Sequence, residues 1–343
     1  MRREAMRLAL PLLLAAAALL AAAPARACGD DGDGAPAAAA AAAAPWDREI
    51  ALRGRRRSLL SLRGRRCGAV PPAPGVLRAV QFALAAHAAK EAARAPAAAR
   101  QGPTTYTIPL HLFNVVSSDG KDRGYVSDAG LKGQVDALNA AYATAVAPDG
   151  SVGNSAGAAG ITWKFDLQGI TRVKAGDMCD QKNEKEVKTA NRKGDKGALN
   201  LYITDLSSCG LLGYSTWPWE LDPKSGKQDA LTMDGVVIHF ETLPGGSYKP
   251  YNEGRTCIHE TGHWMGLFHV FQNGCSKGGD QVDDTPYQAS PSDGCPSSRD
   301  SCPQPGSDPF WNFMDYTDDR CMKGFTPGQH KRMEAMRQLH RQG

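Results

Sequence analysis

The sequence predicts an α/β fold in which a mixed sheet is backed by helices and followed by a small, irregular lobe. Apolar and polar residues alternate in two segments, 106–112 and 161–167, which is the periodicity of a strand. Between them, apolar residues at 131, 135, 138 and 142 fall on one helical face. After residue 269 the chain is rich in cysteine, glycine, proline and aspartate, which is typical of a loop-rich lobe.

The first 27 residues have the pattern of a signal peptide. Three arginines precede an apolar run at 8–23, and small residues at 25–27 provide a cleavage site. A membrane anchor fits less well, because the run is shorter than the roughly 18 residues that a spanning helix needs. Cys28, directly after the site, leaves lipidation open. We therefore expect a secreted, extracellular protein without a membrane span.

Residues 28–103 have the composition of a linker followed by a propeptide. An acidic and alanine-rich stretch at 29–45 leads into a cluster of seven arginines between 53 and 66. Residues 1–104 contain 16 Lys+Arg and 7 Asp+Glu, a net charge of +9, and the whole chain has +4, so residues 105–343 have a net charge of about −5. Such a cluster could bind nucleic acid, but no aromatic residue is interleaved with it and the chain is exported. We expect a propeptide lying against an acidic catalytic domain, no nucleic-acid partner, and cleavage near Arg100.

The predicted catalytic part begins near residue 104. The strand at 106–112 contains Pro109, which donates no ladder hydrogen bond and leaves the strand's neighbours open. Ser127 can cap the helix that follows. Glycine and proline within residues 213–219 predict a loop without a regular element. Two further strands are expected, at residues 199–204 and 234–240.

One segment contains a metal-binding pattern. On a helix, His259 and His263 lie four positions apart, so both imidazoles project from one face and can bind one ion. Glu260 beside them can take a proton from a water molecule that the ion activates. Gly266 allows the chain to leave the helix sharply, so that His269 can return as a third ligand. Three imidazoles with an open fourth position form the ligand set of a catalytic zinc ion.

The alternative interpretation of this segment is a surface helix with scattered histidines. Five residues at fixed offsets should coincide by chance on the order of once in 10⁵ chains, if the positions are treated as independent. The pattern therefore favours a zinc hydrolase.

Nine cysteines are present, and an oxidising compartment allows disulfides among them. Cys179 and Cys209 can form one bridge. Cys257, two residues before the first histidine, is expected to be a small buried residue. The four cysteines of the irregular lobe can be joined in three ways: Cys275, Cys295, Cys302 and Cys321.

Cys67 stands in the sequence Arg-Arg-Cys-Gly, inside the predicted propeptide. A thiolate there can take the fourth position on zinc and exclude water. The alternatives are a disulfide partner or an unpaired thiol. The segment resembles the cysteine switch of latent metzincins, which implies that the chain is made as an inactive zymogen.

The last predicted helix begins at Thr326, with Pro327 at its first position and Gln329 completing a capping box. This helix is expected to be structural. We expect His330 and His340 on the surface rather than as ligands.

The zinc-binding segment resembles the metzincin signature HExxHxxGxxH, with every fixed position matched from His259 to His269. The resemblance implies a metzincin zincin fold in two catalytic subdomains, 104–269 and 270–343. It also implies a methionine turn, with Met314 as the apolar floor of the metal site and Tyr316 reaching toward the metal. In metzincins the outermost strand of the sheet pairs with an extended peptide, and the S1′ pocket lies near the methionine turn. That pocket could involve Asp318, Asp319 and Arg320, which leaves the preferred charge of the substrate open.

A longer match, over residues 105–340, resembles the pappalysin family (M43), especially its secreted cytophagalysin and ulilysin branch. It implies the bridges Cys275–Cys302 and Cys295–Cys321. It also implies calcium in the loop with Asp280, Asp283 and Thr285, where a solvated acidic turn is the alternative. The matching segments lie at 234–238, 243–246, 251–252, 254–256, 274–275, 283–286, 300–302, 308–309, 314–316, 318–322 and 325–329.

These features together predict a zinc metalloendopeptidase (EC 3.4.24) that acts on protein or peptide substrates and is monomeric. Glu260 would be the general base, and Tyr316 would stabilise the oxyanion. A secreted binding or adhesion module that has lost catalysis would show a damaged ligand or base, and none is damaged. A zinc amidase acting on other amides shares the chemistry and stays open.

Overall fold

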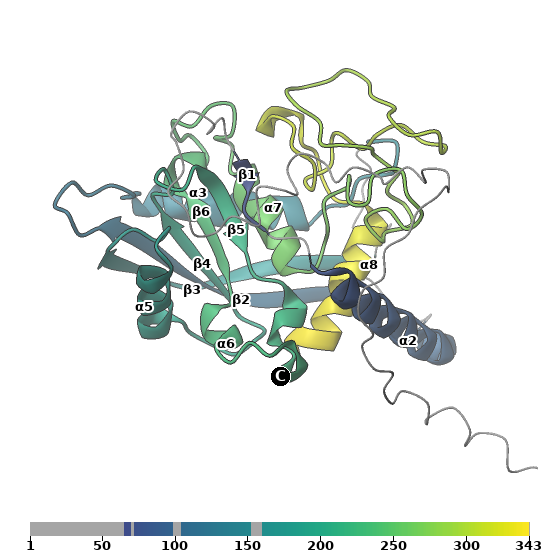
Figure 1. Ribbon diagram of the computed structural model, residues 1–343, viewed down its shortest axis with the longest axis horizontal. Helices are drawn as coiled ribbons and strands as arrows, with labels where there is room; N and C mark the ends of the chain where they lie inside the picture. Colours follow the sequence, from purple (N-terminus) through teal and green to yellow (C-terminus); the bar gives the residue numbers. More distant parts are fainter. Residues whose placement is uncertain (1–64, 70–71, 99–103, 152–159, 343) are drawn as a thin grey trace, which may run out of the picture. The chain divides into compact units, whose positions relative to one another are not determined.

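The structure is a computed structural model that describes residues 65–69, 72–98, 104–151 and 160–342 (Figure 1). The predicted signal peptide, Cys28, the linker and Arg100 lie outside the described residues. Two elements of the predicted propeptide are described, a short strand β1 (Arg65–Cys67) and a long helix α2 (Pro74–Ala98). Among the helices of the described ranges, none is long and apolar enough to cross a membrane.

A six-stranded sheet in the order β1-β5-β6-β4-β2-β3 forms the framework. β2 pairs parallel with β3 and β4, β4 pairs parallel with β6, and β5 runs antiparallel to β6. The sheet is therefore mixed, as predicted. β1 extends it by pairing parallel with the outer side of β5. The other strands are β2 (Thr104–Ser117), β3 (Ile161–Ala175), β4 (Leu199–Thr204), β5 (Leu211–Ser215) and β6 (Val236–His239).

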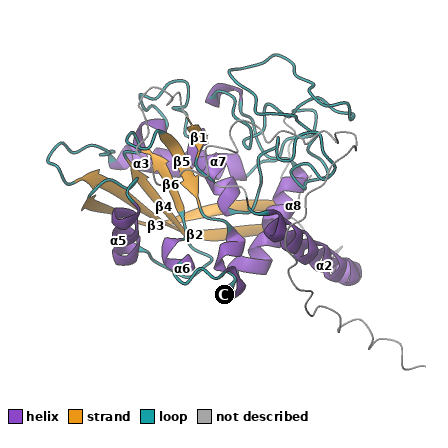
Figure 2. Ribbon diagram, viewed as in Figure 1, coloured by secondary structure: helices purple, strands orange, loops and turns teal. Residues whose placement is uncertain are grey.

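Helices cover both faces of this sheet (Figures 1 and 2). Side chains alternate along β2, so Leu110 and Leu112 join the core under α3 and α7, whereas Phe113 and Val115 join the core that contains Val187 of α5. The predicted helical face is buried in the first core, and the side chain of the predicted cap accepts a hydrogen bond from a backbone amide of the first turn. These helices are α3 (Asp128–Tyr142), α5 (Gln181–Asn191) and α7 (Arg255–Trp264).

One prediction for this part is wrong. Residues 211–215 form the strand β5 instead of the start of a loop, and Gly213 lies inside it. The glycine is needed there because β5 approaches α7 closely: a Cβ at Gly213 would lie 2.8 Å from Cγ of Glu260. Only after Ser215 does the chain leave the sheet, and Pro218 then begins a short 3₁₀ helix, Pro218–Leu221. The short helix α6 (Ala230–Met233) follows before β6.

The segment after His269 has few regular elements (Figure 2). Turns and bends lead to the 3₁₀ helix Asp319–Cys321 and then to α8 (Pro327–Met336), whose start has the predicted capping box. The described residues contain three disulfides, two of them within this lobe, and all three pairs are those expected above: Cys179–Cys209, Cys275–Cys302 and Cys295–Cys321.

The expectation that His330 lies on the surface is wrong. Its imidazole is fully buried, because α8 packs against β3. Nε1 of Trp163 donates a hydrogen bond to Nδ1 of His330 (3.2 Å), and Nε2 of His330 lies 3.0 Å from the carbonyl oxygen of Thr144. A neutral imidazole with its proton on Nε2 satisfies both contacts. His340, in contrast, is partly exposed.

Candidate active site

The helix α7 carries the first two histidines of the site. It lies against β5 and β6, and every residue from Thr256 to Trp264 is buried. The four-residue spacing places the rings of His259 and His263 on the same side, with their centroids 4.7 Å apart. The helix ends as the sequence predicts, because Gly266 adopts a left-handed φ of 93°. A Cβ at this glycine would also lie 2.5 Å from Cγ of Met336, so the close packing of α8 requires glycine too.

Beyond this turn, His269 returns to the other two histidines. Nε2 of His263 and Nε2 of His269 are 3.0 Å apart. The ring nitrogens of all three histidines and the sulfur of Cys67 lie within 4.8 Å of one another, and this is the one such group of four among the described residues. The structure therefore brings together the four side chains that the sequence assigned to one metal.

Backbone carbonyls orient two of these rings. Nδ1 of His259 lies 2.7 Å from the carbonyl oxygen of Phe313, and Nδ1 of His263 lies 2.8 Å from that of Leu267. A proton on each Nδ1 leaves the lone pair on Nε2 to coordinate a metal. Burial, together with the neighbouring imidazoles, lowers the pKa of His263 and His269 well below the usual value, so both rings are neutral at physiological pH. Neutral, buried and convergent imidazoles fit a zinc ion.

Glu260 is fully buried beside this cluster. Its alkyl chain passes close to the backbone of β5, at the position where Gly213 leaves room. Burial raises the pKa of Glu260 to about 8, against the opposing hydrogen bonds of Cys67 and Ser215. A cation held by the histidines would favour the carboxylate. The carboxyl of Glu260 therefore lies where it can exchange a proton with a molecule bound beside the histidines.

The irregular lobe supplies two side chains next to the histidines, Met314 and Tyr316. Met314 is fully buried, and its Sδ lies 2.5 Å from the point where a Cβ at Gly262 would stand. The helix can approach the methionine this closely because residue 262 is glycine. The hydroxyl of Tyr316 lies 3.1 Å from Nε2 of His269, so the tyrosine reaches the metal site as expected.

Cys67 enters the site from β1. The backbone continues the strand pairing, since the amide of Gly68 donates to the carbonyl of Gly213 at 2.8 Å. The amide of Ala69 donates to Sγ of Cys67 at 3.3 Å. Burial, and then the charge of Glu260, raise the pKa of the thiol well above its usual value. Cys257, the other free cysteine of the described residues, is buried within α7, as expected.

A small pocket opens beside His259 and Glu260. Leu212 of β5 and Tyr316 border it, and Asp319 lies on its wall. Asp319 is buried and accepts hydrogen bonds from the amides of Glu253 (2.8 Å) and Arg255 (3.4 Å), while burial raises its pKa to about 6. Of the three charged residues expected near this pocket, the other two do not line it: Asp318 and Arg320 form an ion pair at 3.6 Å, and Arg320 is largely exposed.

The loop proposed for calcium is only partly assembled. Asp280 and Thr285 are buried together, with the hydroxyl of Thr285 donating to Oδ1 of Asp280 at 2.6 Å. Oδ2 of Asp280 is buried without a hydrogen-bond partner among the described residues, and burial raises the pKa of this carboxyl to about 7. Asp283, in contrast, is exposed.

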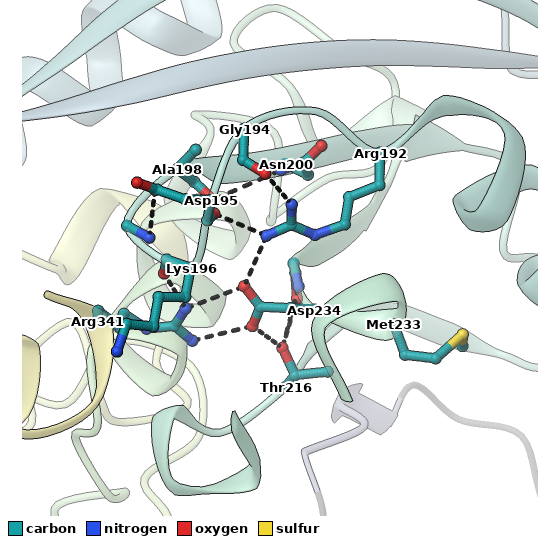
Figure 3. A network of polar contacts seen from close by, with 12 residues as sticks. Arg192, Gly194, Asp195, Lys196, Ala198, Asn200, Thr216, Met233, Asp234 and Arg341 are labelled. Atoms are coloured by element: carbon teal, nitrogen blue, oxygen red, sulfur yellow. Dashed lines mark hydrogen bonds and ion pairs between the residues drawn. The ribbon is translucent and has the colours of Figure 1, made fainter. Parts of the chain in front are cut away.

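A buried charge network anchors the C-terminal end of α7 (Figure 3). Arg341 donates two hydrogen bonds to the carboxylate of Asp234, at 2.9 and 3.0 Å. Nε of Arg341 also donates to the carbonyl of Trp264 (3.0 Å), and its guanidinium lies 3.7 Å from the centre of that indole. Thr216 and Arg192 contact the same carboxylate, at 2.7 and 3.9 Å. Trp264, the residue that follows His263, is thus held by Arg341 and also donates a hydrogen bond from Nε1 of its ring to Asp234 (3.2 Å).

Sequence reasoning missed this network and the aromatic side chain of Trp217, whose ring meets that of His263 edge-on at 4.9 Å. Asp234 lies in a segment that the resemblance included, but its partner is more than 100 residues away. Trp217 could have been noticed as one of two tryptophans, with Trp219, around a proline. No local pattern links either residue to the histidines.

Comparisons with known proteins agree with this geometry. A family model for the M43 peptidases, described as pregnancy-associated plasma protein-A, matches residues 179–338. An extracellular metalloprotease of Pyricularia oryzae is 41% identical over 272 residues, which cover 79% of this chain and 88% of the relative. This chain belongs to the M43 metalloprotease family. As a member, it is a metalloendopeptidase of the metzincin type.

Other M43 proteins support the same conclusion. Extracellular metalloprotease 1 of Coccidioides posadasii is 41% identical over 283 residues, 82% of this chain and 92% of the relative. Mature mirolysin of Tannerella forsythia, solved with a cleaved peptide, has a TM-score of 0.54 at 29% identity and covers 69% of this chain and 96% of its own. A promirolysin mutant has a TM-score of 0.59 at 26% identity and covers 80% of this chain and 95% of its own.

Proposed function

We propose that this M43 metalloprotease is a secreted, zinc-dependent endopeptidase that is made as a latent precursor. One observation carries the proposal: three buried imidazoles from the catalytic part and one thiol from residues 65–69 converge on a single point. Three neutral nitrogens with a displaceable fourth ligand are suited to a catalytic zinc ion that is switched on by losing that ligand. The larger coverage by promirolysin than by mature mirolysin supports the assignment of the first part as a propeptide.

The side chains divide the chemistry among them. When bound, zinc would polarise the scissile carbonyl and make water more acidic. Glu260 takes a proton from the attacking water and delivers it to the leaving amine. Tyr316 donates a hydrogen bond to the oxygen on which negative charge develops. Met314 packs beneath the histidines and keeps α7 in place, because a buried thioether contributes packing rather than charge.

Replacing the base tests the catalytic assignment. Glu260→Ala should retain one zinc per chain and the wild-type fold but lose at least about 10³-fold in activity on casein and peptides, since an enzyme without its base loses on the order of this factor. Zinc content by mass spectrometry and the circular dichroism spectrum serve as controls. Full turnover by this variant would refute the assignment, and a peptide-library digest would separate a protease from an amidase.

Replacing the thiol tests latency. Cys67→Ser should give a precursor that hydrolyses peptides before any cleavage, because a hydroxyl is a much weaker zinc ligand than a thiolate. The matched control is Cys257→Ala, which removes the other free cysteine and should stay latent. If the Cys67→Ser precursor is as inactive as the wild type, Cys67 is not the inhibitory ligand.

Calcium is proposed for the loop around Asp280 and Thr285 only, since Asp283 is exposed. The support is the buried oxygen Oδ2 of Asp280, which a hard cation would satisfy. Adding calcium to the metal-free protein should raise its melting temperature, and the gain should vanish in Asp280→Asn. A wild-type protein whose melting temperature ignores calcium would refute this site.

Export and assembly complete the proposal. The relatives are named as extracellular enzymes, which supports removal of residues 1–27 and release of the protein. Sequencing the amino terminus of the secreted and active forms would test this cleavage and the proposed domain limits at 104 and 270. Light scattering at several concentrations would test whether the enzyme is a monomer.

A further inference from the structure

Three aromatic rings form a continuous apolar surface next to the imidazole cluster. Trp217 and Trp219 stack with centroids 4.8 Å apart, and Phe268 packs against both, at 5.5 and 5.7 Å. We call these three residues the aromatic platform. The edge-on contact of Trp217 with His263 places the platform directly beside the site.

Side chains from residues 65–69 and 72–98 cover this platform in the structure. Val80 of α2 and Ala69, which precedes the helix, are buried in the same apolar cluster as the three rings. Leu77 and Leu84, at helical spacing from Val80, pack against it as well. Most other described side chains of α2 are exposed. The helix therefore uses one aliphatic stripe to cover the platform.

The platform and the pocket contact different histidines of the cluster. Leu212, near the start of β5, borders the pocket, and so does His259. Trp217 lies two residues beyond the end of β5 and contacts His263 instead. A peptide that pairs along the edge of β5 where β1 now lies, but antiparallel to β5 and so opposite in direction to β1, would have the pocket toward its carboxyl end and the platform toward its amino end.

We propose that the aromatic platform is a substrate subsite of the mature enzyme, which binds a large aliphatic or aromatic side chain amino-terminal to the scissile bond. The chemical class follows from the residues that occupy the platform now, which are valine, leucine and alanine. The side of the bond follows from the pocket near the methionine turn, which takes the residue after the bond in metzincins. The inference rests on the proposed removal of residues 65–98 from the active enzyme.

The test uses the mature, zinc-loaded enzyme and pairs of peptides that differ at one position. The peptides carry leucine or serine at the second, third or fourth position before the bond. The wild type should cleave the leucine peptide with a higher kcat/KM at one of these positions. In Trp219→Ala this preference should fall by roughly tenfold, the size expected for one good apolar contact, while cleavage of the serine peptide changes little.

Two variants keep the outcome interpretable. Trp219→Phe should retain most of the preference, whereas Tyr125→Ala, which removes an exposed aromatic ring outside the platform, should leave it unchanged. If Trp219→Ala does not fold or bind zinc, Trp219→Leu replaces it in the same comparison. An equal preference in the wild type and in Trp219→Ala overturns the subsite. Loss of hydrolysis by the wild type itself, or mass spectrometry showing residues 65–98 retained in the active form, would instead refute the proposed function.

Discussion

The two halves of the catalytic part are held together in different ways. Residues 104–269 form a sheet in which neighbouring strands satisfy the backbone, and helices cover both faces. Residues 270–342 have few regular elements, so side chains form many of the hydrogen bonds that the backbone needs there. Asp315, for example, accepts hydrogen bonds from the amide of Ser292 and the side chain of Gln288, at 3.0 Å each. The lobe is thus built from specific side-chain contacts and two disulfides.

The difference separates the buried helix that positions the histidines from the loops that line the pocket. The regular half supplies His259, His263 and Glu260 from one buried helix. The irregular half supplies Met314, Tyr316 and one wall of the pocket, where changes in loops can alter the substrate without moving the metal ligands. Gly262 and Met314 form one of the close contacts between the two halves.

The strongest test of this comparison breaks the network that joins the halves. Arg341 follows α8 but is buried against Asp234 at the start of β6. Arg341→Met should lower the free energy of unfolding by about 3–5 kcal/mol, because it leaves a buried carboxylate without its main partner. Urea denaturation followed by fluorescence and circular dichroism measures the change.

The matched control is Arg320→Met, which removes a largely exposed guanidinium from its ion pair with Asp318. This change should lower the free energy of unfolding by less than about 1 kcal/mol. Equal losses in the two variants would mean that the network does not join the halves. In Arg341→Met both probes should still change together, since the halves share one core.

The disulfides sharpen the comparison, because they close loops of similar length in the two halves, with separations of 30 and 27 residues. Replacing both cysteines of one pair by serine, either Cys179 and Cys209 or Cys275 and Cys302, should therefore lower the free energy of unfolding by about 3 kcal/mol. Only the second pair should also expose the irregular lobe to limited proteolysis by trypsin, since no sheet supports it. Identical digestion patterns for both double variants would contradict this view of the lobe.

The smallest effect concerns pH. Burial lowers the pKa of His330 to about 4, from an ordinary value of 6.5, against the opposing contact with Thr144. Between these values the unfolded chain binds more protons than the folded one, so stability falls as pH falls. The loss should reach about 2 kcal/mol at pH 5 relative to neutral pH.

His330→Gln provides the comparison, because an amide can accept from Trp163 and donate to Thr144 without titrating in this range. Denaturation from pH 7.5 to 4.5 should show a steeper loss in the wild type than in this variant. Parallel curves would show that His330 does not contribute to the loss of stability as pH falls.

Much of the fold followed from local patterns, and the misses have physical causes. The face of α3, its cap at Ser127, the strand at 199–204 and the turn at Gly266 depend on neighbouring residues, and the structure confirms them. β5 was missed because Gly213 is set by the approach of α7, which no local pattern reveals. His330 was misplaced for the same reason, since its partners lie more than 160 residues away.

The site shows the same division. The spacing of His259, His263 and His269 and the position of Glu260 specified a common metal site, and the structure brings these side chains together with Cys67. The arrangement around them could not be predicted, because Trp217 and Arg341 reach the site only through tertiary packing.

The pairing of β1 with β5 has a consequence beyond inhibition. An uncovered outer strand exposes a row of backbone donors and acceptors, which invites pairing with other chains and aggregation. While β1 is in place, Leu211 and Gly213 on this edge already have a partner strand. β1 therefore shields this edge of the sheet, and the proposed removal of the segment that contains β1 would leave the edge open to pairing with an extended peptide.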